Sequence, residues 1–309
     1  MQERPFCSIL VLNFNGLEHL DECFKSISDM KYPKNRFETI MVDNGSADDS
    51  VAFVRKSFPW VRIVKLDRNY GFAEGNNLGM RAAKGEYIVF LNNDTKVAPG
   101  WLTGLVDAAG ISENVGICGS KLFDQKMNKF IGEGTLNLLG VPDIVSRHPE
   151  TSECFFVSGA SMLVKRKVIQ RLGQCFDPEF FAYFEDVDLC WRAKLAGYKV
   201  VYAPASELVH KGGATSKPKP GKLRGSGDLM KFYHYRNKIW AFRKNTRFPL
   251  TQLLMVPLLA TTLLQSARMA VKGNWKYGIS VLGYAFSEKH KSAGIYKVPL
   301  EKQLRVLLG

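Results

Sequence analysis

The sequence predicts an α/β protein with a mostly parallel sheet flanked by helices. In the first third of the chain, apolar runs of strand length alternate with segments of helical periodicity. This alternation is typical of parallel sheets covered on both faces. Two of the runs stop at an acid, Asp43 and Asp94, which is where open α/β sheets bind their ligands. Acids also follow strands because they start turns, but two of them in one sheet indicate a site.

The expected elements follow one another with short connections. Strands are expected at residues 7–12, 38–42, 61–66 and 87–91. The first helix has apolar side chains at the 3.6-residue period, at Leu17, Leu20, Phe24 and Ile27. The second helix follows residues 46–49, which can cap it. A third helix follows residues 69–75 and ends near Gly85.

Beyond about residue 115 the pattern is mixed. Residues 154–164 predict one central strand with small side chains in its middle. The aromatic segment that begins at Phe180 continues as a helix closed at Gly197, and a strand is expected at 199–202. Residues 211–228 are rich in Lys, Gly and Pro, which predicts a basic loop.

The segment from Phe248 to Ala267 is apolar and is flanked by Arg and Lys. Because Pro249, Pro257 and several polar residues interrupt it, the segment is marginal as a spanning helix. A helix lying in an anionic membrane face fits this composition better, and a helical hairpin packed on the preceding domain is the alternative. We therefore expect one domain at 1–245 and a helical, membrane-associating appendage at 246–309.

Composition is that of a globular protein, with 309 residues of which 46% are hydrophobic. The net charge of +14 could serve nucleic acid, an anionic membrane surface or a phosphorylated substrate. Six cysteines without C-x-x-C spacing favour buried free thiols in a reducing compartment over disulfides or a zinc site. The N-terminus has no signal-peptide pattern, so we expect an intracellular protein.

Three common motifs are absent from the sequence. No G-x-G-x-x-G follows the first strand, which disfavours a dinucleotide site. The lack of G-x-x-x-x-G-K-[ST] excludes a P-loop nucleotide hydrolase, and no G-x-S-x-G hydrolase turn occurs.

Two groups of residues could carry chemistry. Glu185, Asp186 and Asp188 occupy the first turn of a predicted helix. Acids there favourably meet the helix dipole, but the preceding aromatic residues would also raise a carboxylate pKa and suit a general base. His210 precedes the basic loop, and an imidazole with a carboxylate could bind Mg²⁺ or Mn²⁺ together with phosphate oxygens.

Several short segments, taken in order, resemble the inverting family-2 glycosyltransferases of the GT-A fold, nearest to the rhamnosyltransferase-like branch. The segments are SILVLNFNG (8–16), VDNGS (42–46), RNYGFAEGNNLG (68–79), FLNNDT (90–95), SGA (158–160), FEDVD (184–188) and YRN (235–237). Each is weak alone, but the ordered set is specific and covers about residues 6–245. The C-terminal segment lies outside the resemblance.

The resemblance implies roles for particular residues. Asp43 would hydrogen-bond the nucleobase, and Asp94 and His210 would bind Mg²⁺ or Mn²⁺. Asn92 stands where the family has the first acid of its D-x-D motif, so metal ligation is assigned to Asp94. Asp186 would be the catalytic base, with Glu185 and Asp188 as its neighbours in the catalytic group. The nucleotide-sugar-binding set would be Asn13, Asn15, Asp43, Asn44, Asn69, Gly71, Asn76, Asn92, Asn93 and Arg236.

The same resemblance implies transfer of a sugar, with inversion, from a nucleotide-sugar donor to a lipid-linked or oligosaccharide acceptor in cell-surface polysaccharide synthesis. The protein would be cytoplasmic and peripheral on the inner face of the cell membrane, without a nucleic-acid partner, and could form a homo-oligomer.

Two rival interpretations remain open. A sugar nucleotidyltransferase would need a Gly-rich, Arg-bearing loop after the first strand, for which residues 13–16 are a poor substitute. A nucleic-acid-binding protein would need basic and aromatic residues on one face, whereas the basic residues here gather in the 211–224 loop and around the apolar C-terminal segment.

Overall fold

The computed structural model describes residues 3–136, 142–145, 148–212, 226–246 and 298–308, together with isolated positions between 256 and 267. The first half contains β1 (Cys7–Asn13), α1 (Leu17–Ser28), β2 (Phe37–Asp43), α2 (Ser50–Ser57), β3 (Arg62–Lys65), α3 (Gly71–Met80), β4 (Tyr87–Asn92), β5 (Thr95–Val97), α4 (Trp101–Gly110) and β6 (Val115–Asp124). The second half contains β7 (Lys129–Ile131), β8 (Glu133–Leu136), β9 (Pro142–Val145), β10 (Ser152–Glu153), β11 (Phe156–Val157), β12 (Ser161–Lys165), α5 (Arg166–Leu172), α6 (Glu185–Leu195), β13 (Lys199–His210), α7 (Ser226–Asn245) and α10 (Leu300–Leu308).

The strands form one large sheet and one small sheet. The large sheet has the order β10-β13-β6-β12-β4-β1-β2-β3, with β5 paired to β13 and β7 to β6. β1 is parallel to β2 and β4, and β2 is parallel to β3, whereas β12 runs antiparallel to both of its neighbours. The predicted α/β class is therefore confirmed, with a parallel first half and a mixed second half.

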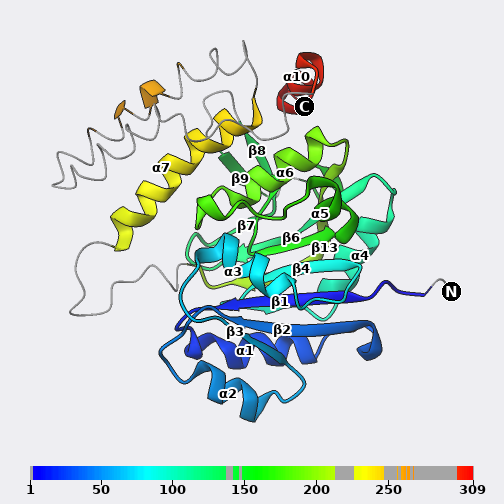
Figure 1. Cartoon of the computed structure of the whole chain (residues 1–309). Coiled ribbons are helices and arrows are strands. Elements are labelled where there is room, and N and C mark those ends of the chain that lie inside the picture. Colours follow the sequence, from blue (N-terminus) through cyan, green and yellow to red (C-terminus); the bar gives the residue numbers. More distant parts are fainter. Residues whose placement is uncertain are drawn as a thin grey trace.

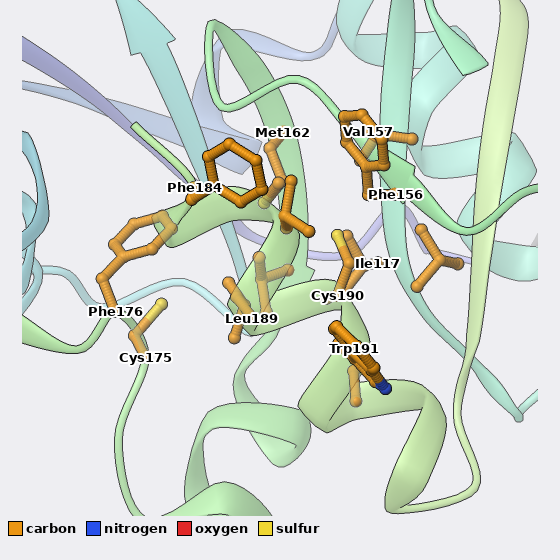
Figure 2. Close-up of a cluster of buried hydrophobic side chains, with 14 of the residues drawn as sticks. Ile117, Phe156, Val157, Met162, Cys175, Phe176, Phe184, Leu189, Cys190 and Trp191 are labelled. Carbon is orange, nitrogen blue, oxygen red and sulfur yellow. The ribbon is translucent and has the colours of Figure 1, made fainter. Parts of the chain in front are cut away.

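Helices cover both faces of the large sheet (Figure 1). Alternate residues of β4 show the division. Phe90 packs with α3, α6 and α7 side chains in one core cluster, and Leu91 packs with α1 and α4 side chains in the other. Figure 2 shows part of the first cluster, in which Trp191 and Leu189 of α6 lie with Ile117 of β6. The two-residue period of a strand explains why one sequence run serves both cores.

The predicted central strand at 154–164 is interrupted, which corrects the sequence analysis. β11 ends at Val157, β12 begins at Ser161, and the intervening residues form a turn. The small residues of the segment belong to this turn and not to a strand interior. As described below, the turn directs the Gly159 N–H toward a carboxylate.

The C-terminal predictions lie mostly outside the described residues. The basic loop is described only at 211–212 and again from 226, where α7 already begins. Most of the apolar segment 248–267 lies outside the described ranges, so its relation to a membrane stays a prediction. Within the described part of the chain, no helix is both long and apolar enough to cross a membrane. The six cysteines are free and buried, as expected.

Candidate active site at the carboxyl edge of the parallel strands

The candidate site lies where the strand order reverses. The chain moves from β1 to β2 and β3 on one side, and returns to place β4 on the other side of β1. Ligands of open α/β sheets bind at such a reversal, outside the carboxyl ends of the strands. The register brings the ends together, because Asn13 pairs with Asp43 and Leu12 pairs with Asn92.

Asp43 is a buried carboxylate with open acceptor positions. The residue is fully buried, and neither of its carboxylate oxygens has a hydrogen-bond partner among the described residues. Buried polar atoms are normally hydrogen-bonded, so an unpaired carboxylate is a candidate for binding a ligand. It can accept N–H groups such as those of a nucleobase edge.

The neighbouring amides bond to one another and to the backbone. Asn44 Nδ2 donates to Asn69 Oδ1 and to the Gly71 carbonyl, both at 3.0 Å, and Asn44 Oδ1 accepts the Tyr70 N–H at 2.9 Å. The buried Asn76 donates to the Phe72 carbonyl within α3. The side chain of Asn44, which follows Asp43, is thus bonded to Asn69 and Gly71, two other residues of the predicted nucleotide-sugar-binding set.

The floor of the site is a second amide network. Asn93 Nδ2 donates to Asn13 Oδ1 at 2.7 Å, and Asn13 Nδ2 donates to Ser46 Oγ at 3.2 Å. Asn15 has a positive φ of 51° and accepts the Ala47 N–H through its side chain. The ends of β1, β2 and β4 are thereby tied into one rigid edge.

Asp94 and His210 lie together although they are far apart in the sequence. β13 pairs antiparallel with β5, which places His210 opposite Thr95, the residue after Asp94. His210 Nε2 is 3.2 Å from Asp94 Oδ1 and 3.4 Å from Asn92 Nδ2. Burial would raise the pKa of Asp94, but His210 and His19 outweigh it and hold this pKa below its ordinary value. Burial would likewise lower the pKa of His210, but the nearby carboxylates raise it above its ordinary value.

The sequence analysis missed Asp124, which is the third polar group of this cluster. It is buried at the end of β6, and its Oδ2 is 3.8 Å from His210 Nδ1. Asp124 Oδ1 accepts the Met127 N–H, which fixes the carboxylate. The parallel pairing of β13 with β6 places His210 opposite Asp124. The sequence signal that could have identified Asp124 is its place at the end of a third strand that stops at an acid.

Asp94 and His210 could supply two of the ligands that a divalent cation needs. Apart from the close approaches of His210 to Asp94 and Asp124, the buried Asp94 Oδ1 and His210 Nδ1 have no hydrogen-bond partner among the described residues. A carboxylate oxygen with an imidazole nitrogen suits Mn²⁺, and the carboxylate also suits Mg²⁺. Within the described ranges, no three His, Cys, Asp or Glu side chains form a ready cage for a metal. The residues present would therefore require ligands from a bound phosphate and water.

Asp186 faces the strand edge from the start of α6. Its Oδ2 accepts the Gly159 N–H at 3.0 Å, and its Oδ1 accepts the Val187 N–H at 2.8 Å. The carbonyl of the next residue, Ala160, accepts the Asn92 N–H at 3.0 Å, so the turn at 158–160 joins the carboxylate to the strand edge. Burial raises the pKa of Asp186 against the effect of these hydrogen bonds.

Glu185 and Asp188 have different surroundings from Asp186. Glu185 is buried with Oε2 unpartnered, and burial, followed by the charges of Asp186 and Asp188, raises its pKa well above the ordinary value. Asp188 is fully buried and paired with Arg192 at 2.7 Å and with Lys244 at 3.0 Å. Burial would raise the pKa of Asp188, but these cations and Asn245 hold it below its ordinary value.

The contacts described for Arg236 are with the loop before α6 and with α7. The residue is 7% exposed, and its Nη2 donates to the Glu179 and Phe180 carbonyls at 2.7 and 3.1 Å. Its guanidinium lies over the Trp240 ring at 4.1 Å. Its predicted contact with the nucleotide sugar stays untested, and the observed contacts instead support the loop before α6.

Comparison with known proteins identifies the family. The model of glycosyl transferase family 2 matches residues 8–173, which is more than half of the chain. The chain therefore belongs to glycosyl transferase family 2. The matched region contains the strand edge with Asp43 and Asp94.

Individual relatives are more distant. An uncharacterised protein of Sinorhizobium fredii is 28% identical over 257 residues, which are 75% of this chain and 28% of that protein. An N-acetylglucosaminyl-diphospho-decaprenol L-rhamnosyltransferase of Mycobacterium tuberculosis is 26% identical over 234 residues, covering 65% of this chain and 75% of the relative. The chain thus spans little more than a quarter of the first relative's length.

Solved structures share the fold. GalNAc-T7, crystallised with UDP, GalNAc and Mn²⁺, superposes with a TM-score of 0.67 over 94% of this chain and 59% of that one, at 13% identity. A mannosyltransferase of Pyrobaculum calidifontis, in complex with GDP-Man and Mn²⁺, gives a TM-score of 0.57 over 93% of this chain and 89% of that one, at 15% identity. The predicted GT-A-type fold is confirmed.

Proposed function

We propose that this chain is a divalent-metal-dependent glycosyltransferase that moves a sugar from a nucleotide-sugar donor to an acceptor hydroxyl with inversion. The observation that carries the proposal is the connected strand edge. Among the described residues Asp43 has two buried carboxylate oxygens without a hydrogen-bond partner, and Asp94 has a buried oxygen beside His210. Asp186 joins the same edge through the 158–160 turn. Family membership supports this interpretation.

Each carboxylate has a separate task in the proposed reaction. Asp43 accepts N–H groups of the nucleobase. Asp94 and His210 would hold Mg²⁺ or Mn²⁺, which when bound neutralises charge on the leaving diphosphate. The structural neighbours that contain Mn²⁺ favour such an ion.

Asp186 takes the proton of the attacking acceptor hydroxyl. Its raised pKa brings the carboxylate closer to the operating pH, where a general base is most effective. One displacement with no enzyme nucleophile inverts the anomeric carbon. Asp188 is paired with two cations, so we assign it a structural role within the predicted catalytic group.

We further propose a lipid-linked acceptor and peripheral attachment to a membrane. The mycobacterial relative is named for a diphospho-decaprenol acceptor, and the net charge of +14 favours an anionic surface. Within the apolar C-terminal segment, Val256, Leu263 and Leu264 are exposed at 70%, 51% and 64%. Exposed apolar side chains of this kind suit contact with lipid.

The function is tested with UDP-, GDP- and dTDP-sugars, each incubated with the full chain and either Mn²⁺ or EDTA. We expect one nucleotide sugar to bind and be consumed in Mn²⁺, and EDTA or Asp94→Ala to abolish consumption. The control variant Lys25→Ala alters an exposed ion pair on α1, away from the strand edge, and should retain activity. No binding of any nucleotide sugar would contradict the function, and undiminished activity in EDTA would contradict the metal.

Membrane attachment is tested by sedimentation with vesicles of phosphatidylglycerol or phosphatidylcholine. Because each basic side chain near an anionic surface contributes about 1 kcal/mol, we expect binding to the anionic vesicles that weakens at high salt. Equal binding to both vesicle types in high salt would argue against an electrostatic attachment, and absence of binding would favour the packed hairpin.

A further inference from the structure

We propose that Asn237 of α7 is a positioning residue that clamps the loop Phe180–Phe184 and thereby places Asp186. The inference rests on the proposed function for its catalytic consequence. The clamp itself is a statement about the fold, so it can be tested without a substrate.

The loop holds conformations that its residues do not favour. Phe181, Tyr183 and Phe184 have φ values of 61°, 70° and 68°. Residues with a Cβ rarely adopt the left-handed region, and bulky ones least of all. Such strain persists only where surrounding contacts over-determine the backbone, and it is commonest at functional sites. Here it immediately precedes α6, which begins at Glu185.

Asn237 supplies contacts that offset this strain. Its Nδ2 is within hydrogen-bond distance of the Phe180, Ala182 and Tyr183 carbonyls, at 2.8, 2.8 and 2.7 Å. Three loop carbonyls thus converge on one fully buried amide. Arg236 Nε donates to Asn237 Oδ1 at 2.8 Å, which orients the amide with its N–H groups toward the loop.

The loop is also hydrogen-bonded to α3, the helix that begins at Gly71 of the predicted nucleotide-sugar-binding set. The Phe181 carbonyl accepts the Phe72 and Ala73 N–H groups of α3 at 2.6 and 3.1 Å. Gly71, with φ of 76°, lies so close that a Cβ there would be 2.5 Å from the Phe181 oxygen. With φ of 61° and ψ of −61°, Phe181 directs this carbonyl toward α3 while the neighbouring carbonyls meet Asn237.

The consequence follows from where the loop ends. Its last residue, Phe184, leads directly into the first turn of α6, where Asp186 must keep its 3.0 Å contact with Gly159. If the Asn237 amide is removed, the Ala182 and Tyr183 carbonyls lose this donor, while the Phe180 carbonyl keeps Arg236 Nη2 and the Ala182 N–H. The backbone at 181–184 can then relax from its positive φ values. The start of α6, and with it the carboxylate, then shifts relative to the strand edge.

The clamp is tested first by hydrogen–deuterium exchange on the full chain without substrate. Asn237→Ala should accelerate exchange of the Phe72 and Ala73 amides and of peptides covering 180–187. The matched control is Asn245→Ala on the same helix, an equally buried Asn whose amide bonds Asp188 and the Ala241 carbonyl. It should lower the Tm without exposing the Phe72 and Ala73 amides. Unchanged exchange in Asn237→Ala overturns the proposal, whatever the activity of the protein.

The catalytic consequence is tested with the nucleotide sugar selected by the UDP-, GDP- and dTDP-sugar panel. Because a displacement of about 1 Å can lower turnover about 10²-fold, we expect Asn237→Ala to reduce kcat on that scale while the donor Kd changes little. Asn237→Ser, which keeps one donor, should recover part of the loss, and Asn237→Asp, which has none, should recover nothing.

The Asn245→Ala control separates positioning from general destabilisation. It should lower kcat much less than Asn237→Ala at an equal loss of Tm. Equal kcat losses in the two variants, or a loss confined to donor Kd, would overturn the positioning role. A panel in which no nucleotide sugar is consumed would refute the proposed function, while the exchange result still decides the clamp.

Discussion

The strand edge and the Phe180–Phe184 loop build two halves of one site by different means. At the strand edge, parallel register alone places Asn13, Asp43 and Asn92 side by side. In the loop, the backbone adopts unfavourable left-handed conformations that side chains of α7, more than 50 residues downstream, hold in place. The edge is held by strand pairing together with the amide bonds between Asn93, Asn13 and Ser46, whereas the loop is held by tertiary contacts with α3 and α7.

The same contrast occurs within one helical turn. Among the described residues, Asp186 accepts hydrogen bonds from two backbone N–H groups and from no side chain, so its carboxylate keeps further acceptor capacity. Asp188 lies two residues further and is neutralised by Arg192 and Lys244. Two aspartates of one helical turn therefore have different surroundings, which is why we propose a catalytic role for Asp186 and a structural role for Asp188.

The largest effect that would sharpen this comparison is expected for Asp186→Asn. The amide is nearly isosteric but cannot take the acceptor proton, so kcat should fall by about 10²–10⁴-fold with donor Kd preserved. Steady-state kinetics with titration of the selected nucleotide sugar measures both quantities. If Asp188→Asn or Glu185→Gln lowers kcat more at equal stability, the base is wrongly assigned.

Asp188→Asn should act on stability instead. Neutralising Asp188 leaves the guanidinium of Arg192 without its carboxylate partner, whereas Lys244 keeps its 2.7 Å ion pair with Asp177. Breaking a buried ion pair on one side costs about 3–5 kcal/mol. Because the folded pKa of Asp188 is depressed, its contribution is present above the unfolded pKa and is lost as pH falls through the folded pKa. Urea unfolding at pH 7 and at acidic pH should show a difference between wild type and variant that shrinks at low pH. A constant difference would argue against an ionised Asp188.

The parts of the site that could be predicted from the sequence are those encoded locally. An apolar run followed by an acid signals a strand end, so Asp43 and Asp94 were identified with the correct strands. Asp124 and Asn237 were missed because their importance depends on what β13 and the 180–184 loop bring beside them. The sequence analysis assigned the small residues at 158–160 to a strand interior. Hydrophobic period and composition do not distinguish a strand interior from a turn, and here the turn directs the Gly159 N–H at a carboxylate.

A smaller effect is expected for Asp124→Asn at the strand edge. Groups that orient a metal-binding histidine typically change metal affinity by about 10–100-fold when mutated, and Asp124 lies 3.8 Å from His210 Nδ1. We therefore expect Mn²⁺ to bind more weakly, as measured by titration calorimetry in the presence of UDP or GDP. Glu207→Gln, which alters an exposed ion pair with Lys121, serves as the control. Equal Mn²⁺ affinity in wild type and Asp124→Asn would remove Asp124 from the site.

The smallest effect concerns the acidic limb of the kcat–pH profile. Burial raises the pKa of Asp186. The midpoint of the acidic limb, where kcat falls with decreasing pH, should therefore lie above about 3.9, the ordinary aspartate pKa. The causes of this shift are burial, which raises the pKa of Asp186, and backbone hydrogen bonds, which lower it; the charge of Glu185 is not among them. Glu185→Gln should therefore leave the limb nearly in place. A marked shift of the limb to lower pH in this variant would show that Glu185 is ionised and that its charge, rather than burial, raises the pKa of Asp186.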